Sequence, residues 1–143
     1  MNNIHSTAII SSKAKLGKNI KIGPYCIVKD NVTIHDNTNL ISHVNIEGFT
    51  TIGKNCTFYP FCSIGTVPQD LKYKGEKSFL IIGDSNTFRE HVTVNPGTLG
   101  GGLKTTIDSD CLFMVGSHIA HDCKIGSNVV LVNNASLAGH VII

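Results

Sequence analysis

The chain has 143 residues, of which 41% are hydrophobic and 15% charged, and its formal net charge is +2. This length suits one domain, and so mild a charge, with Arg89 as the only arginine, gives no reason to expect a nucleic-acid-binding protein. No apolar stretch is long enough to cross a bilayer, and the start, Met1–His5, lacks the basic and apolar regions of a secretory signal, so we expect a cytoplasmic protein.

An aliphatic or aromatic residue recurs at every sixth position through the first part of the chain. An α-helix has a period of about 3.6 residues and an ordinary strand a period of two, so neither alone produces sustained sixes. The run is unbroken and consists of Ile4, Ile10, Leu16, Ile22, Val28, Ile34, Leu40, Ile46, Ile52, Phe58 and Ile64.

A small or β-branched residue commonly stands two positions before the aliphatic one, as at Ala8, Ala14, Val32, Thr38 and Val44. All five cysteines occupy this same slot. We therefore predict that they are reduced core residues and form neither disulfides nor a zinc site, because no CxxC pair is present. The cysteines are Cys26, Cys56, Cys62, Cys111 and Cys123.

Asparagine recurs three positions after the aliphatic residue, which predicts a turn because asparagine tolerates the left-handed backbone region. Each six-residue unit would then make one short strand and one corner, and three units would make one coil of a prism. Successive coils would stack about 4.8 Å apart through parallel ladders, with the aliphatic residues inside. The asparagines are Asn19, Asn31, Asn37, Asn55, Asn128 and Asn134.

Two insertions interrupt the repeat, the first at about Thr66–Leu80 and the second at about Pro96–Thr105. Insertions into such a solenoid leave it as loops, commonly on a binding face. The first carries several charged residues, and the second contains Gly100-Gly101-Gly102, which follows no strand-to-helix pattern and is not a nucleotide fingerprint. The repeat is present between them at Ile82, Phe88 and Val94, and it returns after them at Ile107, Phe113, Ile119, Ile125, Leu131, Leu137 and Ile143.

Two late segments, 112–115 and 129–132, are apolar at positions that must face outward as well as at those that face inward. Outward apolar residues on neighbouring coils indicate a surface that another subunit covers, so we expect a homo-oligomer.

Most of the seven histidines are isolated turn residues, and we read His5, His35, His43 and His91 in that way. His121 differs because it is followed by Asp122, and because Gly139 and His140 stand one predicted coil further on. The repeat geometry therefore places these residues on one edge of adjacent coils. An imidazole beside an acid, with a glycine amide free to point at a substrate, suits general-base acyl transfer.

A zinc site is the competing interpretation of the same histidines. His118 and His121 are three positions apart, and histidines of neighbouring subunits bind zinc in one class of carbonic anhydrases with this kind of fold.

The chain resembles the acyl-[acyl-carrier-protein]–UDP-N-acetylglucosamine O-acyltransferases. The resemblance implies an all-β fold, a left-handed parallel β-helix with two loop insertions that spans residues 1–143. The motifs that carry it extend over essentially the whole chain and are Ile22-Gly23-Pro24, Ser63-Ile64-Gly65, Gln69-Asp70-Leu71-Lys72-Tyr73, Gly100-Gly101-Gly102, His118-Ile119-Ala120-His121-Asp122-Cys123 and Leu137-Ala138-Gly139-His140.

The resemblance also implies roles. His121 would deprotonate the 3-hydroxyl of the glucosamine ring, Asp122 would orient His121, and the amide of Gly139 would stabilise the oxyanion of the thioester. The donor would be a 3-hydroxyacyl chain on acyl carrier protein, in the first step of lipid A synthesis. The enzyme would be a homotrimer without metal or cofactor. The residues that would hold the sugar nucleotide or the acyl chain are Gln69, Asp70, Lys72, His118 and His140.

The sequence departs from the family pattern in two places. Asn95 stands where family members commonly have a histidine, and the repeat stops in mid-pattern at Ile143, whereas the family continues with further coils and a C-terminal helical domain. A truncated, inactive β-helix therefore stays open as an alternative. The related N-acyltransferase of the same pathway is a second alternative, although the repeat starts at Ile4 and leaves no room for the extra domain before it.

Overall fold

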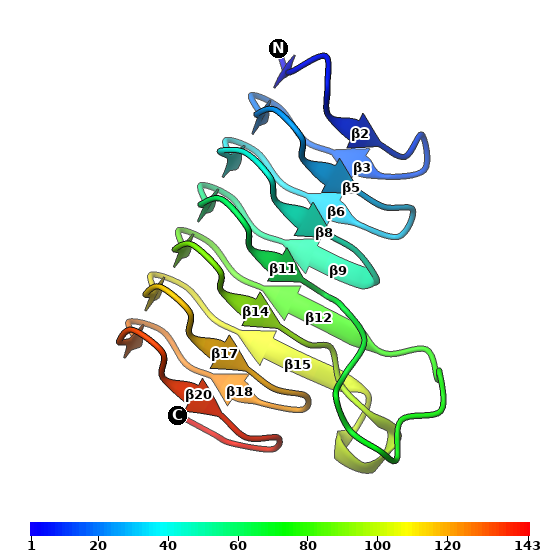
Figure 1. The fold of residues 1–143 in the computed structure, drawn as a ribbon, viewed down its shortest axis with the longest axis vertical. Coiled ribbons are helices and arrows are strands. Elements are labelled where there is room, and N and C mark those ends of the chain that lie inside the picture. Colours follow the sequence, from blue (N-terminus) through cyan, green and yellow to red (C-terminus); the bar gives the residue numbers. More distant parts are fainter.

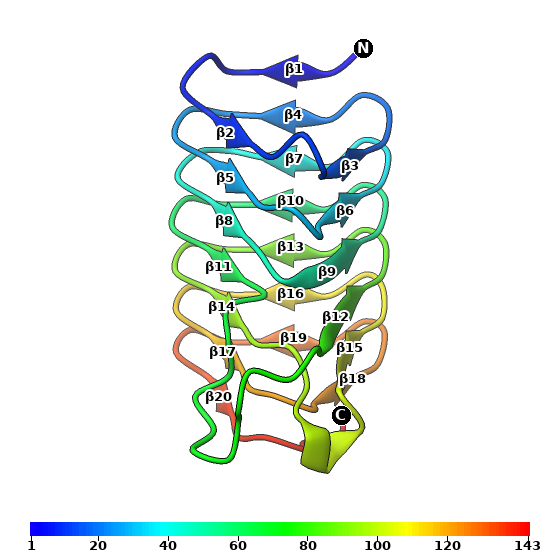
Figure 2. The same cartoon turned by 90° about the vertical axis from the view of Figure 1, so that its right-hand side faces the viewer.

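The computed structural model describes all 143 residues, and its strands form three parallel sheets that are the three sides of a prism (Figures 1 and 2). The fold is a left-handed parallel β-helix, as predicted. The first sheet contains β1 (Asn3–Ile4), β4 (Lys21–Ile22), β7 (Asn39–Leu40), β10 (Thr57–Phe58), β13 (Thr87–Phe88), β16 (Leu112–Phe113) and β19 (Val130–Leu131).

The other two sheets are built in the same way. The second contains β2 (Ile9–Ile10), β5 (Ile27–Val28), β8 (Asn45–Ile46), β11 (Ser63–Ile64), β14 (Thr93–Val94), β17 (His118–Ile119) and β20 (Ser136–Leu137). The third contains β3 (Lys15–Leu16), β6 (Thr33–Ile34), β9 (Phe49–Ile52), β12 (Phe79–Ile82), β15 (Lys104–Ile107) and β18 (Lys124–Ile125). A 3-10 turn, η1 (Leu99–Gly101), is the one helical element, and no helix is suited to crossing a membrane.

The register of the ladders shows where the repeat is interrupted. Lys21 pairs with Asn39 on the next coil, as an uninterrupted repeat requires, whereas Thr57 pairs with Thr87 across the first insertion. We use "first insertion" for residues 65–78, between β11 and β12, and "second insertion" for residues 95–103, between β14 and β15. Both leave the prism on the same side, near its C-terminal end (Figure 1).

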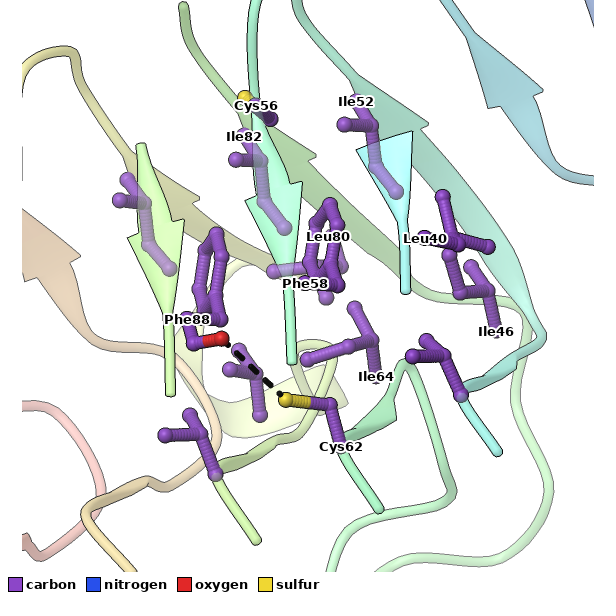
Figure 3. Packing of buried hydrophobic residues seen from close by; sticks show 14 of the residues in the cluster. Leu40, Ile46, Ile52, Cys56, Phe58, Cys62, Ile64, Leu80, Ile82 and Phe88 are labelled. Atoms are coloured by element: carbon purple, nitrogen blue, oxygen red, sulfur yellow. Dashed lines mark hydrogen bonds between the residues drawn. The ribbon is translucent and has the colours of Figure 1, made fainter. Parts of the chain in front are cut away.

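The aliphatic positions of the repeat line the axis of the prism. In most two-residue strands the first residue faces outward and the second is buried, because successive side chains of a strand point to opposite faces. The centre holds a continuous stack of rings, in which Phe58 and Phe88 lie 4.6 Å apart between centroids and Phe88 and Phe113 lie 4.9 Å apart. Figure 3 shows part of this packing.

The small slot is inward-facing, as predicted. All five cysteines are buried and unpaired. Burial raises the pKa of Cys56 to about 11 and that of Cys62 to about 12, so their thiols stay protonated and unreactive. Asn86 also occupies this slot, two positions before Phe88, although it is neither small nor β-branched. Its buried side chain donates a hydrogen bond to the carbonyl of Asp108 and accepts one from the amide of Cys111.

The asparagine slot is a left-handed turn at five of its six predicted positions, and Asn31 is the exception, since its φ is not positive. Other residues occupy the same slot in the same conformation, on the corner that also carries Asn134. Tyr25, His43, Phe61 and His91 all have positive φ, and their rings form a column with neighbouring centroids 5.1–5.2 Å apart. His43 and His91 are therefore turn residues, as expected, but they are not isolated.

Candidate active site

His121 and Asp122 occupy the corner that follows β17. Asp122 has a φ of +61°, and this left-handed turn directs its carboxylate to the imidazole of the residue before it. Nδ1 of His121 lies 2.8 Å from Oδ2 of Asp122. Because a carboxylate only accepts hydrogen bonds, Nδ1 carries a proton, and in the neutral ring this tautomer leaves the lone pair that a base requires on Nε2.

The Asp122 carboxylate is fully buried and is held by the second insertion. The amide of Thr98 donates to Oδ1 at 2.8 Å, and the hydroxyl of Thr98 donates to Oδ2 at 2.5 Å. Burial by itself would raise the pKa of Asp122, but the hydrogen bonds from Thr98 and His121 outweigh it and lower that pKa. Asp122 is therefore a fixed anion that can orient the imidazole.

Gly139 lies directly beneath the His121 ring on the next coil, as the repeat arithmetic predicted. A Cβ built on Gly139 would overlap with the imidazole, so any larger residue would displace the ring. The amide of His140 donates to the carbonyl of His121 at 3.0 Å, whereas the amide of Gly139 has no acceptor within the chain. The Gly139 N–H is thus free to donate to a bound molecule.

The first insertion brings Asp70 to the other nitrogen of the imidazole. Oδ2 of Asp70 lies 4.0 Å from Nε2 of His121, and both side chains are mostly buried. This approach places the insertion over the corner of the β-helix that carries His121, as its course along the last coils shows (Figure 2).

Two cavities adjoin the His121–Asp122 pair. The larger has a volume of about 620 Å³ and is formed by the two insertions and His140, with Asp70, Lys72, Lys74, Gly75, Glu76, Thr98, Leu99 and Gly100 as its other lining residues. The smaller has a volume of about 380 Å³ and contains His121 itself, together with Gln69, Asn95, His118, Ala120, Ser136, Leu137 and Ala138.

His118 faces the smaller cavity and is held by Thr93, whose hydroxyl lies 2.7 Å from Nδ1. Burial lowers the pKa of His118, which favours the neutral ring. Asn95, at the position noted for its departure from the family, is buried. Its Nδ2 donates to the carbonyl of Thr66 at 3.0 Å, while its Oδ1 has no partner.

A metal ion would find ligand atoms here but would have to displace existing bonds. His121, Asp122 and His140 each offer one ligand atom, and these atoms lie within 4.8 Å of one another. Both oxygens of Asp122 already accept hydrogen bonds from Thr98, and Oδ2 also accepts one from His121. The geometry therefore suits an oriented histidine base better than the zinc alternative.

All eight residues singled out from the sequence converge on this corner. Gln69, His118 and His121 line the smaller cavity, and Asp70, Lys72 and His140 line the larger one. Asp122 is hydrogen-bonded to His121, and Gly139 packs against the His121 ring. Sequence reasoning missed Thr98, which anchors Asp122, and Glu76, which contacts the second insertion. Both residues lie in the insertions, outside the six-residue repeat. The repeat spacing therefore does not predict which residues they contact.

Comparisons with known proteins agree with this fold. The family model "Bacterial transferase hexapeptide (six repeats)" matches residues 104–143. The acyl-[acyl-carrier-protein]–UDP-N-acetylglucosamine O-acyltransferase of Thermodesulfovibrio yellowstonii is 55% identical over 141 residues, which are 99% of this chain and 55% of that protein. The corresponding protein of Rickettsia peacockii is 59% identical over 85% of this chain and 46% of its own length.

A solved structure shows the same likeness in three dimensions. The UDP-N-acetylglucosamine O-acyltransferase from Moraxella catarrhalis superimposes with a TM-score of 0.95 and 49% identity, over 98% of this chain and 55% of that one. The chain thus spans about half the length of the curated relatives that it matches.

Proposed function

Since this chain belongs by sequence and fold to the acyl-[acyl-carrier-protein]–UDP-N-acetylglucosamine O-acyltransferase family, of which it covers the N-terminal portion, we propose that it carries that family's acyl transfer. The reaction moves a 3-hydroxyacyl group from acyl carrier protein to the 3-hydroxyl of UDP-N-acetylglucosamine. The observation that supports this most directly is the His121–Asp122 pair, whose Nε2 is free beside a cavity.

In the proposed mechanism Nε2 of His121 takes the proton of the 3-hydroxyl as the sugar oxygen attacks the thioester carbonyl carbon. The charge that develops on the carbonyl oxygen is stabilised by the N–H of Gly139, which has no other acceptor. When the tetrahedral intermediate collapses, the C–S bond breaks, and the leaving sulfur takes the proton back from His121. Asp122 stabilises the imidazolium that exists between these two proton transfers.

The lining of the larger cavity supports a nucleotide-linked acceptor. Lys72 and Lys74 of the first insertion face the same space as His140, and ammonium groups are common ligands of phosphates. Gln69 and His118 in the smaller cavity supply the polar groups that a sugar ring would need. His121 lines the smaller cavity, and Asp70, which lines the larger one, lies 4.0 Å from its Nε2, so the reacting hydroxyl would lie near this nitrogen.

The test is acyl transfer by this chain from a 3-hydroxyacyl carrier protein to UDP-N-acetylglucosamine, followed by mass spectrometry of the product. We expect an O-acylated sugar nucleotide and no product when N-acetylglucosamine replaces the nucleotide sugar. An absence of product with a folded sample would mean that the portion of the family present here is inactive by itself. Transfer only to an amino sugar would favour the related N-acyltransferase.

We also propose that the chain is a homotrimer. Val130 and Val132 are 57% and 62% exposed on the last coils, and Leu112 and Met114 face outward on the coil before. Light scattering is expected to give the mass of three 15.4 kDa chains, and Val130→Asp to lower it, because a charge would have to be buried in the apolar contact. A monomer at all concentrations would contradict this proposal.

The five unpaired, buried thiols suit a reducing compartment, and we place the proposed activity in the cytoplasm on that ground.

A further inference from the structure

Glu76 connects the two insertions through its carboxylate. Oε1 accepts the amide of Lys74 at 2.7 Å, within the first insertion, and Oε2 accepts the amide of Leu99 at 3.0 Å, in the second. The other hydrogen bonds between these segments lie where the insertions leave and rejoin the β-helix. Asn95 donates to the carbonyl of Thr66, and Phe79, directly after the first insertion, donates to the carbonyl of Leu103 and accepts the amide of Gly97. Glu76 is therefore their only hydrogen-bonded link away from the base.

We propose that Glu76 is a positioning residue that holds the two insertions together over the His121–Asp122 pair and so forms the larger cavity. The proposal rests on the proposed function only for what the cavity binds. The link itself is a property of the fold.

The second insertion provides the fixed side of this link. Leu99 follows Thr98, whose amide and hydroxyl are both bonded to the buried Asp122. Gly101, two residues later, packs so closely on the Asp122 side chain that a Cβ there would overlap with it. The amide that Glu76 accepts is thus attached to a segment anchored to the body of the β-helix.

The first insertion is the side that needs support. Its own bonds are local: the Lys72 amide donates to Oδ1 of Asp70 at 2.9 Å, and the Tyr73 hydroxyl donates to the carbonyl of Glu76 at 3.1 Å. These bonds shape the loop but do not attach it to anything else. Through its bond to the Leu99 amide, Glu76 attaches this loop to the segment that is bonded to Asp122. The same loop places Asp70 within 4.0 Å of Nε2 of His121.

The composition of the larger cavity shows what depends on the link. Apart from His140, every lining residue belongs to one of the two insertions. The cavity therefore keeps its shape only while the insertions keep their relative position. The pKa of Glu76 is lowered chiefly by the amides of Lys74 and Leu99, so the acceptor is ionised at neutral pH and both bonds are charge-assisted.

The experiment compares Glu76→Ala and Glu76→Gln with Asp36→Ala in the whole chain. Asp36 is a matched control because its carboxylate also accepts a backbone amide, that of Lys18 at 2.8 Å, but on a coil without insertions. Amide hydrogen exchange is measured on peptides that cover residues 65–78 and 95–103. The Michaelis constant for UDP-N-acetylglucosamine is measured in parallel.

In Glu76→Ala we expect exchange in the first insertion to become faster by about tenfold, and KM to rise by about tenfold while kcat stays within about twofold. Glu76→Gln should lie between Glu76→Ala and the unchanged protein, since its amide oxygen can accept only one of the two bonds. Asp36→Ala should alter neither quantity. If Glu76→Ala folds poorly, the same comparison is made with Glu76→Gln.

Unchanged exchange in the first insertion of Glu76→Ala or Glu76→Gln would refute the link. Faster exchange with an unchanged KM would refute its role in positioning. The exchange measurement requires no substrate, so a failure of the proposed function would leave this part of the test intact and would be seen separately, as absent turnover of the unmodified chain.

Discussion

Replacement of His121 by alanine is expected to lower kcat/KM for acyl transfer by about 10³-fold. The physical reason is that His121 is the imidazole in the smaller cavity that a buried carboxylate orients through Nδ1. Asp122 is engaged by Thr98 and faces away from solvent, and His118 has its Nδ1 at the Thr93 hydroxyl. The measurement is the initial rate of O-acylated product at several concentrations of UDP-N-acetylglucosamine.

His35→Ala is the matched control for this variant. His35 is an exposed histidine that follows β6, two coils before the strand that follows the first insertion, and it lines neither cavity, so its loss should leave the rate unchanged. Thermal unfolding should show that both variants fold, since His121 lies at the surface of a coil and contributes no core packing. A His121→Ala enzyme that keeps more than about a tenth of its activity would exclude the proposed proton transfer.

The spacing of the core residues was enough to predict the β-helix, because each six-residue unit contributes the same inward side chain. Ile22, Ile34 and Phe58 are all fully or almost fully buried, as the sixfold period required. No contact between residues far apart in the sequence has to be known for this prediction, because every unit packs only on units one coil away. Sequence therefore determines this part of the fold almost residue by residue.

The convergence of His121 with Gly139 and His140 was predictable for the same reason. One coil separates them, and the ladder between β17 and β20 pairs His118 with Ser136 and so places the two corners side by side. Thr98 and Glu76 could not be found in this way. Their contacts depend on how two irregular loops return to the β-helix, and those paths follow from tertiary packing rather than from a period.

The column of Tyr25, His43, Phe61 and His91 is a second feature that the sequence concealed. A left-handed backbone is costly for residues other than glycine and asparagine, by roughly 1 kcal/mol or more each. Here each ring contacts the ring of the next coil, at 5.1–5.2 Å between centroids, with two of the pairs tilted and one stacked. Contact along the stack offsets a local preference that would have predicted asparagine or glycine at these corners.

Phe88→Ala is expected to lower the free energy of unfolding by about 3–5 kcal/mol. Phe88 is completely buried and has an aromatic neighbour on each side, Phe58 and Phe113. Removing it leaves a cavity in the axis of the prism, which the rigid parallel ladders above and below cannot close. Unfolding in urea, followed by circular dichroism, measures the change.

Phe79→Ala is the control, because Phe79 lies in β12, the strand just before that of Phe88, but faces outward and is 38% exposed. Its loss should cost about 1 kcal/mol or less, since the side chain is already partly exposed to solvent and no interior cavity forms. Equal destabilisation by the two variants would show that the axial stack is not the main source of stability. In a solenoid each coil is stabilised only through its neighbours, so a cavity at Phe88 weakens two interfaces at once, and one of them holds the coil that leads to His121.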